Sequence, residues 1–128
     1  LQLLHGTAEN RTQEIQQISG QLLGLAKELN IPIVVLSQLS RDNAKGNARP
    51  QLHNLRDGGS LEQDAHVVLL IHRPNKSEDS NRFTDGEEVE LILAKQRMGP
   101  AGRTIKVGWH GPTMRFTDIA PESQDGAA

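Results

Sequence analysis

The clearest pattern in the chain is a stripe of apolar residues near its start. Between Thr12 and Leu29, apolar side chains recur at spacings of three and four residues, at Ile15, Ile18, Leu22, Leu25 and Leu29. This spacing is typical of an amphipathic helix, because residues three and four apart share one face. Asn10 or Thr12 can cap the start of this helix, and Asn30 with Pro32 can end it. We therefore predict a helix over residues 12–29.

Four runs rich in apolar residues predict strands. Ile33–Leu36 and Val67–Ile71 are apolar throughout, as expected of strands that are covered on both faces in a parallel sheet. Val89–Ala94 and Thr104–Trp109 are joined through glycines and a proline, which predicts a hairpin. A helix that leads into a buried strand favours an α/β layer. The predicted fold class is therefore α/β, with a mostly parallel sheet, flanking helices and a C-terminal β-hairpin.

Polar segments separate these elements. Residues 40–51 and 74–86 have the composition of exposed connections, and Gly58-Gly59 should interrupt any helical turns around them. Residues 119–128 are expected to form a disordered tail. The chain starts without Met, and its first four residues, LQLL, resemble the end of a buried strand. We therefore expect residues 1–118 to be the C-terminal part of a larger domain.

Length and composition limit the class of protein further. A length of 128 residues suits one small domain. The sequence contains no run of about eighteen apolar residues and no signal-peptide pattern, so we expect no membrane segment. It contains no Cys, which excludes disulfides and thiolate metal sites and is compatible with a cytoplasmic protein. The five His residues show no clustered ligand spacing, so we predict no metal site.

The net charge of −2 conceals an uneven distribution. Residues 41–57 carry four cations and two acids, and residues 95–115 carry five cations and no acid. Between them, residues 76–90 hold two cations and six acids. Two basic segments of this kind suit a polyanion, although solvated loops produce the same pattern. With one Trp, two Phe and no Tyr, a nucleic acid would be bound through its backbone rather than by base stacking.

Three short polar segments carry candidate chemistry. Gln38 follows the first predicted strand, and ligands of open α/β sheets lie beyond the carboxyl ends of strands. The segment LRDGGS, residues 55–60, sets Arg56 beside glycines that allow close approach to a phosphate backbone. Lys95 and Arg97 alternate along a strand, so both can act on one anion. Each segment also has a plain alternative: a polar strand end, a glycine-capped helix end and a solvated hairpin end.

Read together, three segments resemble the C-terminal half of the RecA-like motor domain of DnaB-type replicative DNA helicases. They are ENRTQEIQQISGQLLGLAKELNIPIVVLSQLSR, LRDGGSLEQDA and ILAKQRMGPAG. They occur in the family's order, and the resemblance extends from Leu1 to about Phe116. It implies a partial RecA-like P-loop NTPase fold in a ring, usually a hexamer. ATP would lie between neighbouring subunits of that ring, and single-stranded DNA would pass through its centre.

The resemblance implies nucleotide-related roles for four residues. Gln38 looks like the sensor that relates the state of the γ-phosphate to the DNA-facing loops. Lys95 and Arg97 match the finger that reaches the γ-phosphate bound by the adjacent subunit, with Gln96 between them. A cation supplied in this way stabilises charge on the transferring phosphoryl group.

The resemblance also implies a DNA-binding loop. Arg56, Asp57 and Gly59 match the loop that holds the DNA backbone. The family pattern has Glu-Ser where this chain has Asp57-Gly58, and an acid where this chain has His66. The shorter acid and the added glycine change the details expected of the DNA contact.

The function implied by the resemblance is that of an ATP-dependent replicative DNA helicase, which translocates on single-stranded DNA and unwinds the duplex at the replication fork. The implied cofactors are ATP and Mg²⁺, and the implied partners are single-stranded DNA, further copies in a homo-hexamer, a primase and a helicase loader. No G-x-x-x-x-G-K-[ST] motif is present, and the family's P-loop is expected upstream. This chain alone should therefore not hydrolyse ATP. A RecA-like recombinase-type ATPase fragment and a non-enzymatic nucleic-acid-binding module stay open as alternatives.

Overall fold

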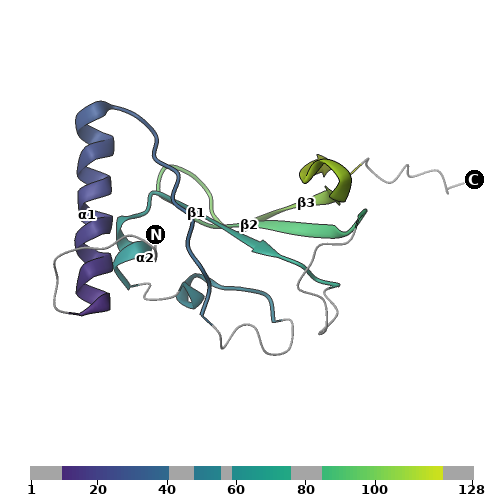
Figure 1. Cartoon of the computed structure of the whole chain (residues 1–128), viewed down its shortest axis with the longest axis horizontal. Coiled ribbons are helices and arrows are strands. Elements are labelled where there is room, and N and C mark those ends of the chain that lie inside the picture. The colour runs from purple at the N-terminus through teal and green to yellow at the C-terminus, as the bar shows by residue number, and fades with distance from the viewer. Residues whose placement is uncertain (1–9, 41–47, 56–58, 76–84, 120–128) are drawn as a thin grey trace, which may run out of the picture.

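The computed structural model describes residues 10–40, 48–55, 59–75 and 85–119. In these ranges the chain forms two α-helices, α1 (Arg11–Leu29) and α2 (Gly59–Asp64), and two 3-10 turns, η2 (Leu52–Asn54) and η3 (Gly111–Thr113). Its four strands are β1 (Val67–His72), β2 (Glu88–Gln96), β3 (Arg103–His110) and β4 (Arg115–Asp118). Helix α1 stands at one side of the molecule, and the sheet extends away from it (Figure 1).

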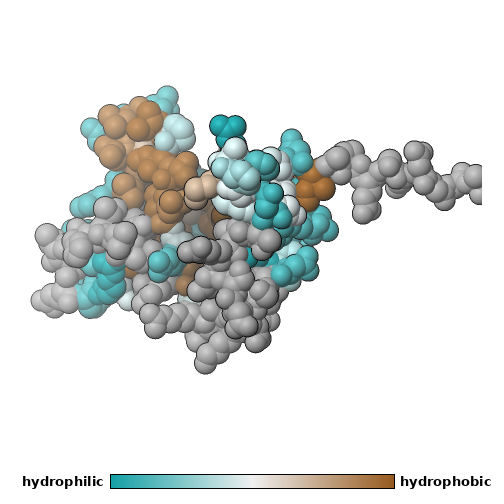
Figure 2. All heavy atoms as spheres, turned by 45° about the vertical axis from the view of Figure 1, so that its right-hand side comes forward, coloured by the Kyte–Doolittle hydropathy of each residue, from teal (hydrophilic) through white to brown (hydrophobic). Residues whose placement is uncertain are grey.

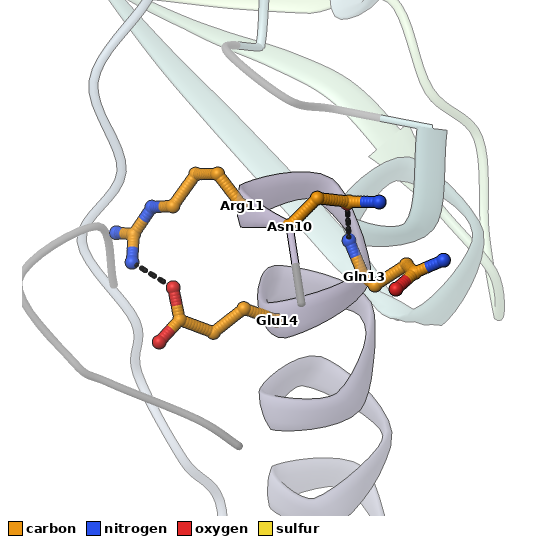
Figure 3. Close-up of polar contacts among 4 residues, drawn as sticks. All are labelled: Asn10, Arg11, Gln13 and Glu14. Carbon is orange, nitrogen blue, oxygen red and sulfur yellow. Dashed lines mark hydrogen bonds and ion pairs between the residues drawn. The ribbon is translucent and has the colours of Figure 1, made fainter. Parts of the chain in front are cut away.

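The predicted first helix is confirmed as α1, and its ends are capped. The Asn10 side chain accepts a hydrogen bond from the Gln13 backbone N–H at 2.9 Å, so Asn10 is the N-cap (Figure 3). Arg11 pairs with Glu14 at 2.5 Å within the first turn. Asn30 ends the helix in the left-handed conformation, with φ of 52°, and its backbone N–H donates to carbonyls of the last turn.

Only the first half of the apolar stripe is buried. Ile15 is fully buried and Ile18 is 7% exposed, whereas Leu25 and Leu29 are 43% and 54% exposed. The predicted strand at Ile33–Leu36 is not formed, and this segment has no regular secondary structure. It pairs with none of the four described strands, so much of its apolar surface stays open to solvent.

The sheet has the order β1-β2-β3-β4, and all three pairings are antiparallel. The predicted mostly parallel sheet is therefore wrong for the residues that the structure describes. Parallel pairing requires a crossover connection, usually a helix, and both described α-helices precede β1. The predicted C-terminal hairpin is confirmed as β2 and β3, with a register from Glu88↔Gly108 to Leu93↔Arg103.

Strand β4 was not predicted, and it pairs with β3 as the last strand of the sheet. Trp109 pairs with Phe116 across β3 and β4, and their rings meet edge to face with centroids 5.3 Å apart. Met114 ends η3 in the left-handed conformation, at φ of 52°, and turns the chain back toward β3.

The main core lies on one face of β1 and β2. Val68, Leu70 and Ile92 are buried there, packed against the half-buried residues Leu39, Leu52, Leu55, Ala65 and Ala94. The opposite face of β1 was also expected to be covered, but Val67, Leu69 and Ile71 are 57%, 52% and 48% exposed. Hydrophobic side chains also gather on the surface near the C-terminal end of α1 (Figure 2).

Within the described ranges, no helix combines the length and the apolar character that crossing a membrane requires.

Candidate functional site

A β-bulge in β2 sets the direction of the predicted finger. Leu69 of β1 pairs with Leu93, whereas Val68 pairs with Lys95, which leaves Ala94 as the extra residue. An extra residue bends the strand and changes which side chains follow on each face. Lys95 therefore lies opposite the core residue Val68, on the side of the sheet that carries α2.

Both finger cations contact the last turn of α2. The Lys95 ammonium donates to the carbonyl of Glu62, and to that of Gln63 at 3.2 Å. Arg97 Nη2 donates to the same Gln63 carbonyl at 2.9 Å, and the Arg97 backbone N–H donates to the His66 carbonyl at 2.8 Å. Carbonyls at the C-terminal end of a helix lack helical partners and carry partial negative charge, so they suit cations. The structure thus brings Lys95 and Arg97 together on one side of the strand.

Helix α2 is itself fastened to α1. Ser19 Oγ donates to Asp64 Oδ2 at 2.7 Å, although the two residues are 45 positions apart. Ser19 is only 7% exposed, so this hydrogen bond is made by a buried hydroxyl. The sequence pattern predicted no role for this serine. The available signal is its position four residues after Ile15, where a polar residue interrupts the apolar face of the helix.

The predicted DNA-binding loop is described only at its end. Arg56 and Asp57 lie outside the described residues, and Gly59 is the first residue of α2. A Cβ added at Gly59 would meet no atom within 4 Å, so its backbone is open to approach. The next residue, Ser60, has a buried hydroxyl that finds no hydrogen-bond partner among the described residues. The open backbone of Gly59 and the carbonyls that hold the finger cations therefore lie at opposite ends of one short helix.

Gln38 is followed in the chain by Leu39, which contacts the segment that leads into the predicted DNA-binding loop. Leu39 forms an isolated antiparallel bridge with Leu55, the residue before Arg56. The Ser40 backbone N–H donates to the Asn54 carbonyl at 2.8 Å beside that bridge. Gln38 itself is exposed, and the apolar segment before it, Ile33–Leu36, does not form a strand. Backbone contacts therefore link the segment that follows Gln38 to the start of the predicted DNA-binding loop. Gln38 does not contact Lys95 or Arg97 in the described part of the chain.

A second group of charges lies at the far end of β1 and was not predicted. Arg73 and Glu87 form a paired contact, with Nε–Oε1 at 2.5 Å and Nη2–Oε2 at 2.9 Å. His72 pairs with Glu90 across the strands, and Arg49 Nε lies 3.4 Å from Glu90 Oε2. Burial lowers the pKa of His72 from 6.5; the Glu90 carboxylate opposes this shift, and the Arg49 charge adds to it. No set of three or more acidic, His or Cys side chains in the described ranges could hold a metal ion.

The family comparison gives the class of this chain. The profile of the DnaB-like helicase C terminal domain matches residues 1–118, and the chain belongs to this family. The resemblance read from the three sequence segments is thereby confirmed.

Individual relatives agree with this assignment. The chain is 45% identical over 114 residues to a protein named replicative DNA helicase DnaB from Leifsonia xyli, covering 88% of this chain and 24% of that protein. It is 41% identical over 127 residues to the protein of the same name from Haemophilus influenzae, covering 97% of this chain and 26% of that protein. The chain thus spans about a quarter of the length of these relatives.

Two solved structures share the fold. The first, an ATPase domain, matches with a TM-score of 0.79 and 35% identity, over 94% of this chain and 42% of that one. The second, a DnaB-like replicative helicase described with its interactions with primase, matches with a TM-score of 0.75 and 34% identity, over 91% of this chain and 28% of that one. These alignments place the present fold within DnaB-like ATPase domains.

Proposed function

We propose that this chain is part of the motor domain of a ring-forming replicative DNA helicase, with a partial RecA-like P-loop NTPase fold. In the complete protein, this motor hydrolyses ATP, moves along single-stranded DNA and unwinds the duplex at the replication fork. The observation that carries the proposal is the family match over residues 1–118, together with relatives named replicative DNA helicase DnaB. The same match favours a helicase over a recombinase-type ATPase.

The exposed apolar surface supports the view that the chain works within a larger domain. Val34 and Leu36 are 88% and 82% exposed, and one whole face of β1 is open. Large apolar side chains left open to solvent in such numbers are typical of an interaction site. Because the chain matches only 42% of the solved ATPase domain, we propose that the remainder of such a domain, including the P-loop, covers this surface.

The chemistry of the finger cations suits a phosphate. Lys95 and Arg97 already direct their donor groups at carbonyl oxygens, and phosphate oxygens with a full negative charge are stronger acceptors of the same bonds. Arg97 is exposed and lies just before a turn, so it can reach a neighbouring subunit. ATP held by that subunit would supply the phosphoryl group. Lys95, Gln96 and Arg97 would contact the γ-phosphate and stabilise its developing charge.

The remaining site residues complete the proposal. Gln38 senses the γ-phosphate and acts on the DNA loop through the segment bridged by Leu39 and Leu55. Arg56, Asp57 and Gly59 hold the DNA backbone. The described residues provide no cluster for Mg²⁺, so its ligands would come from other parts of the ATPase domain. The expected partners are five further copies in the ring, single-stranded DNA, a primase and a loader, and the expected location is the cytoplasm.

The test is the ATPase rate of the full-length protein with and without single-stranded DNA. Arg97→Ala should lower the stimulated rate by about 10³-fold or more while nucleotide binding is kept. Arg103→Ala is the matched control, because Arg103 is an exposed cation of the neighbouring strand that has no proposed role. A wild-type protein that binds DNA but shows no ATPase activity would instead support the non-enzymatic nucleic-acid-binding module.

A further inference from the structure

Helix α2 connects two parts of the proposed motor. Its first residue is Gly59, the described end of the proposed DNA loop, and the carbonyls of its last turn hold Lys95 and Arg97. A helix of six residues at ~1.5 Å per residue is about 9 Å long. A displacement of one end of so short a helix is therefore transmitted to the other end.

One residue fixes the orientation of the end that holds the cations. Asp64 is the last residue of α2 and directly follows Gln63, whose carbonyl accepts from both Lys95 and Arg97. The Asp64 carboxylate is held by the buried Ser19 hydroxyl of α1 at 2.7 Å. The Ala65 backbone N–H donates to the Leu61 carbonyl at 3.1 Å and closes the same turn. The carbonyls of Glu62 and Gln63 therefore point toward β2 from a turn that is anchored to α1.

We propose that Asp64 is a positioning residue for ATP hydrolysis, acting with Ser19 through the last turn of α2. By fixing that turn it sets where Lys95 and Arg97 are held, and it joins the finger to the end of the helix that contacts DNA. When single-stranded DNA binds at the Gly59 end of α2, the carbonyls at the other end shift. This shift changes the hydrogen bonds that hold Lys95 and Arg97. The inference rests on the proposed helicase function and adds to it a route from the DNA loop to the finger.

The experiment uses the full-length protein and separates coupling from folding. Four quantities are measured: the ATPase rate without DNA, the rate with saturating single-stranded DNA, the KM for ATP and the Kd for the DNA. Asp64→Ala and Ser19→Ala should each lower the ratio of stimulated to unstimulated rate by about tenfold, a typical effect of losing one hydrogen bond to a charged group. The KM and the Kd should stay within about twofold of wild type, because neither residue is proposed to touch ATP or DNA.

Two further variants serve as controls. Asp64→Asn keeps an acceptor for the Ser19 hydroxyl and should keep the stimulation ratio. Gln16→Ala removes an exposed side chain from α1, the helix that carries Ser19, and should also keep the ratio. If Asp64→Ala does not fold, as a thermal-unfolding scan would reveal, Ser19→Ala tests the same hydrogen bond from α1.

The possible outcomes discriminate between the inference and the function on which it rests. Equal losses in the rates with and without DNA would mean that Asp64 supports only the fold, and the inference would be wrong. A weakened Kd with an unchanged ratio at saturating DNA would also overturn it. A wild-type protein without any DNA-stimulated ATPase activity would overturn the proposed helicase function itself.

Discussion

Glu87 and Glu88 are adjacent in the chain, but the structure predicts very different consequences when each is replaced by Ala. Glu87 forms its two contacts with Arg73 in a nearly buried pair, with side chains 7% and 12% exposed. Glu88 meets Lys106 at 3.0 Å, with side chains 34% and 60% exposed. Removing one partner of a buried ion pair leaves the other charge poorly compensated, at a cost of about 3 kcal/mol. Removing one partner of an exposed, solvent-screened pair costs less than about 1 kcal/mol.

Amide hydrogen exchange in the full-length protein can measure this difference locally, at β1 and β2. At about 1.4 kcal/mol per tenfold change, Glu87→Ala should accelerate the exchange of these strands by about 100-fold, and Glu88→Ala by no more than about fivefold. Glu88→Ala is also the matched control, because it removes the same side chain one position away. Equal acceleration by both substitutions would refute the assignment of a buried ion pair to Arg73 and Glu87.

Three further predictions concern a cap, a titration and a DNA contact. Asn10→Ala should destabilise α1 by about 1 kcal/mol in the same exchange assay, whereas Thr12→Ala should have little effect, because Asn10 accepts the capping hydrogen bond. Because burial lowers the pKa of His72, neutral His72 favours the folded state, so the protection of β1 should be full above pH 6.5 and fall as the pH drops below it. His72→Gln should remove that pH dependence, and an unchanged profile would contradict it. When the logarithm of the binding constant for single-stranded DNA is plotted against the logarithm of the salt concentration, Arg56→Ala should make the slope shallower by about one. Arg115→Ala, which removes an exposed cation on β4, should leave that slope unchanged.

Those parts of the fold that depend on local pattern could be predicted from the sequence. Spacings of three and four residues identified α1, and Asn30 was correctly named at its end. Two apolar runs joined by glycines identified the β2–β3 hairpin, because its pairing is set by neighbours in the chain. Gly102, with φ of 84° and its N–H donating to the Leu93 carbonyl at 2.7 Å, is the residue that lets this turn close.

Features that depend on distant partners could not be predicted in this way. An apolar run such as Ile33–Leu36 becomes a buried strand only where neighbours pair with it, and none of the described strands does. Strand β4 has only four residues, all exposed, so it carries no alternating pattern.

The arrangement of the candidate site was also beyond local pattern. Alternation placed Lys95 and Arg97 on one face, but the bulge at Ala94 selects that face, and α2 is the element that meets it. Ser19 and Asp64 are 45 residues apart, and neither residue alone indicates the contact. The roles of Gln38, Arg56 and Asp57 stay predictions from the family resemblance.

The most direct test of the proposed motor is complementation in mixed rings of the full-length protein. One variant carries Arg97→Ala, and the other lacks the P-loop lysine that the family resemblance places upstream; each should hydrolyse almost no ATP alone. If Arg97 acts on the nucleotide of the neighbouring subunit, mixing the two should restore DNA-stimulated ATPase activity, because an intact P-loop then meets an intact finger. If the mixed rings stay inactive although both variants assemble together, Arg97 does not act between subunits, and the central account of this chain is contradicted.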